Sequence, residues 1–385
     1  MISTVWPYVA VLLFAAGLFP SLEARYGWRV FNVLPPIVWT YLLVTALAVA
    51  GLWQGSDEIH AAQRALTAQL LPALLFLLMV TCDLRAIIAL GPRLLAVFAC
   101  AMASMLLAVV FAYAMFRHAL PADGWKMLAL LSATWTGGSA NLVAVKEIVA
   151  LPENLLPPVL LADALCYSTW IVVLFATSGL APAFNRWTRA TPKAPLLPVE
   201  GLGRGFDPAH YPVPAKASSS SDSLPRSLPP GGRDDVRERD ATLQEVHPGP
   251  SHAGQALLWL GIALMVGLGA AALGARMPVA TMFTQTSWTV LFATLAGLAI
   301  ARTPLARVSG PTPLASALLA CLVAVLGSQS NFEGMSAAPL FVLVGFCVLA
   351  LHAMLLLGAA RLFRFDLHLC GIASLAGIGG AATAP

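Results

Sequence analysis

Residues 132–147 read SATWTGGSANLVAVKE and interrupt an otherwise apolar run with two adjacent glycines, Gly137 and Gly138. Hydroxyl side chains and an amide flank the glycines, and the charged residues Lys146 and Glu147 follow. A helix break is costly in a bilayer because the freed backbone groups find no water, so it is tolerated where it is buried in protein or lines a cavity. Broken helices of this kind build substrate and ion sites in secondary transporters. The alternative is a plain loop whose hydroxyls cap two separate helices.

The composition is that of a helical membrane protein. The chain has 385 residues, 59% of them hydrophobic and 10% charged, and its mean hydropathy is +0.80. An ordinary soluble domain carries about 25% charged residues, so that class is excluded. Apolar runs of about 17 to 25 residues, long enough to span a bilayer, recur along nearly the whole chain. We therefore predict an all-α, polytopic protein of the cell inner membrane, and the net charge of +4 gives no reason to expect nucleic-acid binding.

The cysteines and the N-terminus agree with this class. The six cysteines are scattered through apolar segments without a CxxC pair or a Cys/His cluster. We predict buried thiols and neither disulfides nor a transition-metal site. Residues 1–20 lack a basic region and a small-residue cleavage site, so they are predicted to form a first membrane helix and not a signal peptide.

The chain divides into three predicted parts. Residues 1–180 form a first membrane repeat and residues 253–385 a second. Residues 181–252 are rich in proline, serine and mixed charge without apolar periodicity, which predicts a disordered linker. We expect about 11 helical elements of membrane-spanning character. They cover residues 5–19, 34–53, 66–82, 94–116, 125–150, 155–180, 256–273, 287–300, 314–327 and 340–360, and a last one starts near residue 367.

The two halves share a spacing pattern that indicates two structural repeats, each with an interrupted helix at a Gly-Gly pair. The spacing of Ser132, Gly137 and Gly138 is matched by that of Ser374, Gly379 and Gly380. Pro92 and Pro339 both open the preceding helix. By this symmetry the second half lacks the rest of its interrupted helix and one further helix. We therefore expect the sequence to be truncated at its C-terminus, with a natural short variant as the alternative.

Ionisable side chains inside the membrane are the candidates for ion coupling, because a central Asp costs about 2.5 to 3.5 kcal/mol on insertion scales. Asp163 lies mid-segment among aliphatic residues, and Tyr167, four residues on, shares its helix face and is expected to hydrogen-bond it. Lys146 and Glu147 are adjacent and point about 100° apart on a helix, so we expect no facing pair. The predicted ion-coupling residues are Asp163, Asn141, Tyr167, Glu147 and Asp83. The alternative for Asp163 is a structural carboxylate paired with another helix, for Glu147 snorkelling near the helix end, and for Asp83 an interfacial position. His352 is expected to be a core histidine bonded to a neighbour.

The predicted substrate site lies at the two interruptions. It comprises Thr134, Thr136, Gly137, Gly138, Ser139, Asn141, Ser374, Gly379, Gly380 and Thr383. These side chains and the freed carbonyls offer hard neutral oxygens, which suit Na⁺ better than a transition metal. A half-helix that starts near Ser139 would direct its positive end toward an anionic group. We expect no cofactor other than Na⁺ as a coupling ion.

Four segments carry a resemblance to a known family. They are residues 132–147, LLADALCYSTW at 160–170, CDLR at 82–85 and residues 374–383, and they resemble the uncharacterised bacterial and plastid membrane family that includes the YjcL proteins. The match covers both membrane halves but not the linker, and members of that family continue beyond the second glycine pair. Their fold looks like that of the inverted-repeat transporters, which include bile-acid sodium symporters and cation–proton antiporters. The resemblance implies secondary transport and no particular substrate.

The predicted function is secondary active transport, with Na⁺- or H⁺-coupled movement of a small, possibly anionic solute by alternating access. The alternatives are a cation–proton antiporter without organic substrate and a non-transporting membrane scaffold. No HExxH or GxSxG motif occurs, so we do not expect an enzyme. The sequence leaves open whether the protein forms a homodimer. Six crossings in the first half would make the repeats parallel, whereas a net five would invert them, and the basic residues fit both arrangements.

Overall fold

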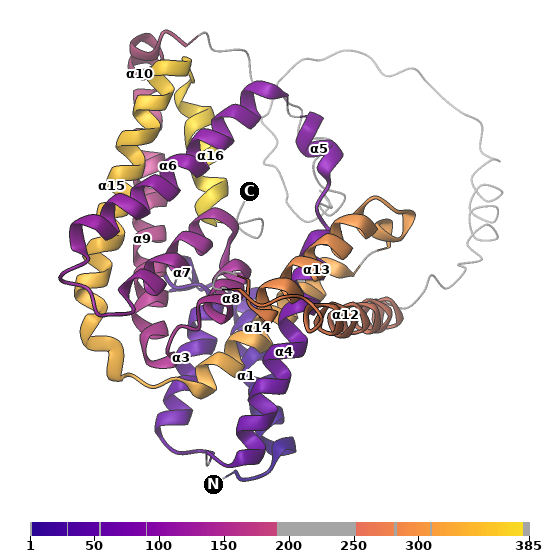
Figure 1. Cartoon of the computed structure of the whole chain (residues 1–385). Helices are drawn as coiled ribbons and strands as arrows, with labels where there is room; N and C mark the ends of the chain where they lie inside the picture. Colours follow the sequence, from indigo (N-terminus) through magenta and orange to yellow (C-terminus); the bar gives the residue numbers. More distant parts are fainter. Residues whose placement is uncertain are drawn as a thin grey trace, which may run out of the picture. The chain divides into compact units, whose positions relative to one another are not determined.

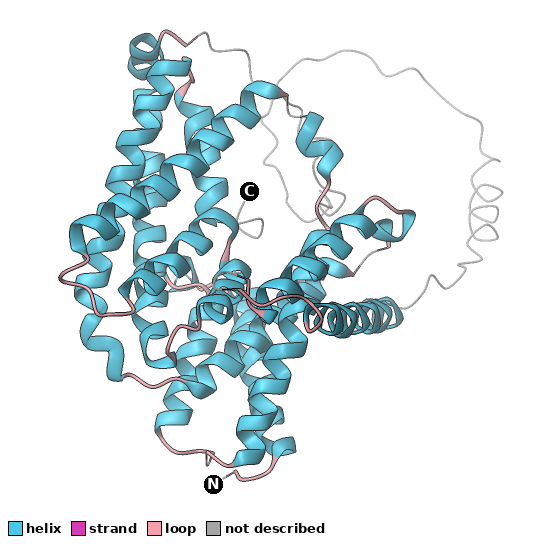
Figure 2. Ribbon diagram, viewed as in Figure 1, coloured by secondary structure: helices cyan, strands magenta, loops and turns pink. Residues whose placement is uncertain are grey.

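The computed structural model describes residues 2–28, 30–53, 55–89, 91–190, 252–280, 283–308 and 310–379 (Figure 1). Two isolated β-bridges, Ile2–Trp53 and Ala280–Phe283, are the only extended pairings among these residues, and helices make up the remaining regular structure (Figure 2). The all-α prediction is therefore confirmed. Within the described ranges, seven helical stretches are long and apolar enough to cross a membrane, which supports a multi-pass membrane protein.

The helices of the first half follow the predicted order. They are α1 (Val5–Tyr26), α2 (Val30–Val33), α3 (Pro36–Val49), α4 (Asp57–Val80), α5 (Leu84–Ala89), α6 (Pro92–Phe116), α7 (Gly124–Gly137), α8 (Ser139–Val149), α9 (Leu156–Thr177) and α10 (Ala181–Thr188). Local chemistry fixes several of the helix starts. Proline opens α3 and α6, where its missing N–H costs nothing. Ser56 caps α4 by accepting a hydrogen bond from the backbone N–H of Ile59.

The second half repeats this pattern. Its helices are α12 (His252–Gly274), α13 (Gln285–Ala301), α14 (Pro311–Gln329), α15 (Ala338–Phe363) and α16 (Leu367–Gly379). Thr284 and Ser287 form a capping box at the start of α13, and Pro311 opens α14. The predicted helices of both halves therefore all appear; most ends shift by a few residues, but α1 ends seven residues later and α4 begins nine residues earlier than predicted.

Contacts between the halves have the symmetry that two repeats require. Helix α3 packs on α14 and α4 packs on α13, and exchanging the repeats turns one of these pairs into the other. Helix α6 packs on its counterpart α15, and α7 on its counterpart α16. The two-repeat architecture is thus visible in the packing as well as in the sequence spacing.

Glycine allows close approach in both of the exchanged pairs. A Cβ atom at Gly297 of α13 would lie 2.6 Å from the carbonyl oxygen of Phe76 on α4. A Cβ atom at Gly327 of α14 would lie 2.9 Å from the carbonyl oxygen of Tyr41 on α3. Small residues at helix contacts are a general means of packing in membranes, where burial of apolar surface provides no driving force between helices.

The predicted linker starts too early. Residues 181–188 form α10, which packs on α15 and α16, and the side chain of Asn185 accepts a hydrogen bond from the backbone N–H of Leu367 at 3.0 Å. The polar composition of this segment reflects a helix with one buried and one exposed face, which a search for continuous apolar runs overlooks. The rest of the predicted linker, residues 191–251, lies outside the described residues.

Candidate functional site

The interruption at the first glycine pair is a sharp turn between two half-helices. Helix α7 ends at Gly137, and Gly138 has φ 82° and ψ 177°, a conformation that is essentially restricted to glycine. Helix α8 then begins at Ser139, where the sequence predicts the start of a half-helix. A Cβ atom at Gly137 would meet the side-chain amide of Asn141, which would have to move, whereas Gly138 is required by its backbone conformation.

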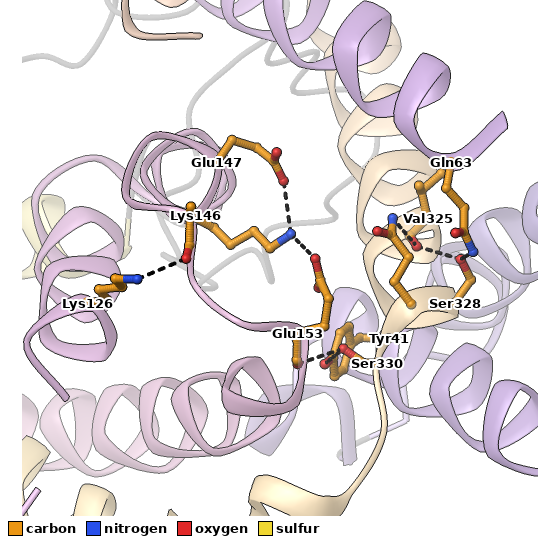
Figure 3. A network of polar contacts seen from close by, with 11 residues as sticks. Tyr41, Gln63, Lys126, Lys146, Glu147, Glu153, Val325, Ser328 and Ser330 are labelled. Atoms are coloured by element: carbon orange, nitrogen blue, oxygen red, sulfur yellow. Dashed lines mark hydrogen bonds and ion pairs between the residues drawn. The ribbon is translucent and has the colours of Figure 1, made fainter. Parts of the chain in front are cut away.

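The two half-helices fold back on each other. The Lys126 ammonium, near the start of α7, donates a hydrogen bond to the carbonyl oxygen of Ala150, just beyond α8, at 3.1 Å (Figure 3). In one continuous helix these residues would be about 36 Å apart, at 1.5 Å per residue. The α7–α8 unit is therefore a hairpin whose tip is the Gly137–Gly138 turn.

The hairpin bears on the orientation of the repeats. Both ends of the α7–α8 hairpin lie on the same side of it, so the hairpin adds no net membrane crossing. If α1, α3, α4, α6 and α9 each cross once, the first half makes five crossings. The sequence leaves parallel and inverted repeats open, and five crossings correspond to inverted repeats.

A small cavity lies beside the start of α8. Its volume is about 50 Å³, and its lining comes from α3, α8, α9 and α14. The polar groups in the lining are Tyr41, Ser139, Asp163 and Tyr167, and the other residues are apolar. The structure thus brings together three predicted site residues, Ser139, Asp163 and Tyr167, which are far apart in sequence.

The partner of Asp163 differs from the prediction. The indole Nε1–H of Trp135 donates to Asp163 Oδ1 at 2.8 Å, and Tyr167 makes no hydrogen bond to this carboxylate. Trp135 lies on α7 next to the turn. Because the hairpin packs against α9, its indole takes the place beside Asp163 that Tyr167 was expected to occupy. The contact connects the tip of the hairpin directly to the candidate ion ligand.

The threonines before the turn are engaged within their own helix. Thr134 Oγ1 donates to the carbonyl oxygen of Leu130 at 3.1 Å, and Thr136 Oγ1 donates to that of Ser132 at 2.8 Å. Each hydroxyl oxygen still retains acceptor capacity. Neither threonine belongs to the lining of the small cavity.

The two repeats meet at this turn, as the sequence predicts. A Cβ atom at Gly377 of α16 would lie 3.3 Å from the carbonyl oxygen of Trp135. Gly379 is the last residue of α16, and the predicted site residues Gly380 and Thr383 lie outside the described residues.

Ser374 lies in the core and not in a cavity lining. The Trp170 indole donates to Ser374 Oγ at 3.0 Å, and His352 Nε2 and Ser374 Oγ are 2.9 Å apart. His352 Nδ1 is 2.9 Å from Ser104 Oγ, whose hydroxyl donates to the carbonyl oxygen of Ala101. Every polar hydrogen in this series of hydrogen bonds has an acceptor if the Ser374 hydroxyl donates to His352 Nε2 and His352 Nδ1–H donates to Ser104 Oγ. His352 is a core histidine bonded to its neighbours, as expected.

Lys146 lies at the centre of an ion cluster at the other end of α8. Its ammonium bonds to Glu147 Oε1 at 3.0 Å and also to Glu153 Oε1 (Figure 3). The expectation that Lys146 and Glu147 form no pair is wrong, because the long lysine side chain bends toward its neighbour. Only 6% of the Lys146 side chain is exposed. Glu153 gave no signal in the sequence, since it follows the hairpin and approaches Lys146 only after the chain turns into α9.

A larger cavity of about 390 Å³ lies against this cluster. Its charged lining residues are Arg64, Lys146, Glu147 and Glu153. Its neutral polar lining residues are Thr67, Gln285, Thr286, Thr289 and Gln329. The sequence pointed to Glu147 alone, because the other groups come from five separate helical elements and show no common motif. Asp83 is exposed between α4 and α5 and lines neither cavity.

A short hydrogen-bond chain connects the two cavities. The hydroxyl of Tyr41, in the small cavity, donates to Ser330 Oγ at 2.6 Å. Ser330 Oγ donates to the backbone carbonyl of Glu153 at 3.1 Å (Figure 3). The residue at the far end of this chain is therefore the glutamate that holds Lys146 in the larger cavity.

Comparison with known proteins assigns the family. The model of the family described as "Protein of unknown function (DUF819)" matches residues 10–197 and 238–385, and the chain belongs to this family. The two matched regions contain the two membrane repeats. No curated protein and no solved structure matches the chain.

Proposed function

We propose that this protein is a secondary active transporter that moves a small solute across the cell inner membrane by alternating access, driven by Na⁺ or H⁺. The observation that carries the proposal is the α7–α8 hairpin, whose tip meets α16 of the other repeat and whose Trp135 holds Asp163. Irregular backbone at a repeat interface, beside an intramembrane carboxylate, is the arrangement of substrate and ion sites in secondary transporters.

The small cavity is the proposed coupling-ion site. Asp163 supplies the charge, and Ser139, Tyr41 and Tyr167 supply neutral oxygens in an otherwise apolar lining. Hard oxygen ligands suit Na⁺, and a carboxylate surrounded by apolar groups equally suits a proton carrier. The resemblance to sodium symporters and cation–proton antiporters supports both ions.

The size of the small cavity favours one second candidate, a cation–proton antiporter without organic substrate. A volume of about 50 Å³ has room for an ion with a few waters and little room for a bulkier organic solute. In that case the larger cavity would be only an aqueous entrance. Transport assays separate the two candidates, because an antiporter moves cations without any added solute.

The experiment that tests the proposal compares thermal unfolding of purified wild-type protein in Na⁺ and in K⁺ between about pH 5 and 9. A ligand that binds only the folded state stabilises it by about 2.7 kcal/mol at a hundred times its dissociation constant. We expect a Na⁺-specific or pH-dependent rise in the unfolding temperature that is lost in Asp163→Asn. Asp57→Asn is the matched control, because Asp57 is exposed in the first turn of α4.

Transport is then measured in proteoliposomes under an imposed Na⁺ or proton gradient. With a mixture of small solutes added, we expect the wild type and Asp57→Asn to dissipate the gradient and Asp163→Asn to leave it intact. Dissipation by the wild type without any added solute would favour the antiporter. If Asp163→Asn responds to ions and pH as the wild type does, Asp163 is a structural residue. The proposed coupling site is then wrong.

A further inference from the structure

We infer that the larger cavity is the solute site and that it takes a small amphoteric solute, one that carries both a carboxylate and an ammonium group, as amino acids do. This inference rests on the proposed transport function and names the class of its substrate. It comes from the opposite charges that three separate segments of the chain bring to one cavity.

The negative side of the larger cavity has an unused acceptor. Lys146 bonds to one oxygen of Glu147 and one of Glu153, so the three side chains together carry one negative charge. Glu153 Oε2 is buried, and no described residue donates a hydrogen bond to it. A buried carboxylate oxygen without a donor is costly, and an ammonium group is the donor that suits it best. The cluster therefore favours a cationic group on the solute.

The positive side is Arg64 on α4. This side chain lines the same cavity and forms no ion pair with any residue that the structure describes. A guanidinium binds a carboxylate through two parallel hydrogen bonds, a geometry that a point charge cannot match. A purely cationic solute would meet Arg64 as a like charge, and a purely anionic one would leave Glu153 Oε2 without a donor.

The neutral lining fits a compact solute. Threonine hydroxyls at 67, 286 and 289 and the amides of Gln285 and Gln329 offer both donors and acceptors. The apolar wall consists of Ala68, Leu71, Ala271 and Val290. Such a site combines a few directed polar contacts with apolar surface for a short side chain, as ligand sites generally do.

Helix α8 contributes to both the solute site and the ion site. The start of α8 lines the small cavity through Ser139, and its last turns line the larger one through Lys146 and Glu147. The chain from Tyr41 through Ser330 reaches the backbone of Glu153. An ion bound near Asp163 thus acts on the groups that hold the solute, which is what coupling requires.

The test is a binding measurement on the purified full-length protein, with the unfolding temperature as readout. The probes are the protein amino acids taken one at a time, and for each one that binds, the matched acid without the amine and the matched amine without the acid. For valine, for example, these are 3-methylbutanoate and isobutylamine. We expect at least one amino acid to raise the unfolding temperature and its two fragments to leave it unchanged.

The variants locate the site. Arg64→Gln and Glu147→Gln should each weaken the apparent affinity about tenfold or more, the loss expected for a charged hydrogen bond. Glu147→Gln leaves the bond between Lys146 and Glu153 in place and is therefore the mildest change to the cluster. Arg117→Gln is the control, since Arg117 is exposed at the end of α6 and does not line this cavity.

The outcomes separate this inference from the proposed function. If acids or amines bind alone, or if no amino acid binds, the amphoteric site is wrong, while Na⁺ or pH effects that depend on Asp163 would leave the transport proposal standing. If an amino acid binds in a manner that depends on Arg64 but never accumulates in proteoliposomes under either gradient, the site is right and secondary transport is wrong. Equal loss of binding in Arg117→Gln would also contradict the assignment.

Discussion

Replacing Lys146 by methionine should be among the most destabilising single changes in the protein. The substitution keeps most of the side-chain volume but removes the ammonium group that bonds to both Glu147 and Glu153. At 3.0 Å from Glu147, one such pair is worth about 5.5 kcal/mol of Coulomb attraction at an effective dielectric constant of about 20. Desolvation of the lysine offsets part of this, so the net cost of breaking the cluster is about 3 to 5 kcal/mol, as for other buried pairs that lose one partner.

Lys126 provides a matched comparison. Its ammonium lies 2.9 Å from Asp123, almost the same distance, but 20% of its side chain is exposed, against 6% for Lys146. An exposed pair contributes about 0 to 1 kcal/mol, and the hydrogen bond from Lys126 to Ala150 adds about 1 kcal/mol. We therefore expect Lys126→Met to cost no more than about 2 kcal/mol.

The assay is unfolding in mixed detergent micelles, followed by tryptophan fluorescence, for the wild type and both lysine variants. The triple variant Lys146→Met/Glu147→Gln/Glu153→Gln should recover most of the stability lost in Lys146→Met, because no unpaired charge remains. The reasoning is refuted if Lys146→Met costs no more than Lys126→Met, or if the triple variant is less stable than Lys146→Met alone.

Three further predictions concern the turn, the topology and the link between the cavities. Gly138→Ala should destabilise the protein by about 1 to 3 kcal/mol, because φ of 82° with ψ of 177° suits only glycine. The control in the same assay is Gly358→Ala in α15, which should be neutral or slightly stabilising because there is open space where its Cβ would lie. Equal effects of the two variants would contradict the strained turn. Reporter fusions at the N-terminus and after residue 190 should report opposite sides of the membrane, since the hairpin leaves five crossings between them, and the same side would disprove the inverted arrangement. Ser330→Ala should preserve binding of the coupling ion and of the solute but reduce the effect of the ion on the affinity for the solute. The measurement is a titration of each ligand in the presence and in the absence of the other ligand. An unchanged effect would exclude the Tyr41–Ser330–Glu153 hydrogen bonds as the route of coupling.

The helices and their order were predictable because local chemistry marks their ends. Pro36 and Pro92 open helices, and Gly138 ends one, for reasons that lie within a few residues of each. The repeat was also predictable, because the spacing of its glycines and prolines is visible in the amino-acid sequence. Helix α10 was missed because its polar face hid a short helix within a polar segment.

The partners of the site residues were not predictable, because they depend on how helices pack. Asp163 takes its hydrogen bond from Trp135, 28 residues away, and not from Tyr167 on its own helix face. Lys146 finds Glu153 only because the chain reverses after α8. The direction of the hairpin decides the contact between Trp135 and Asp163, and nothing in SATWTGGSANLVAVKE distinguishes a kinked helix that continues from one that turns back.

The hairpin also explains why a helix of 11 residues is well suited to couple two ligands. Helix α8 is about 16 Å long, and its start and end line different cavities through Ser139 and Glu147. Such a short rigid element cannot move at one end without moving at the other. The Gly138 turn is the joint between α8 and α7, and Lys146 attaches the far end of α8 to Glu153. If the small cavity binds the coupling ion, we therefore expect ion binding to displace α8 and the ion cluster of the larger cavity with it.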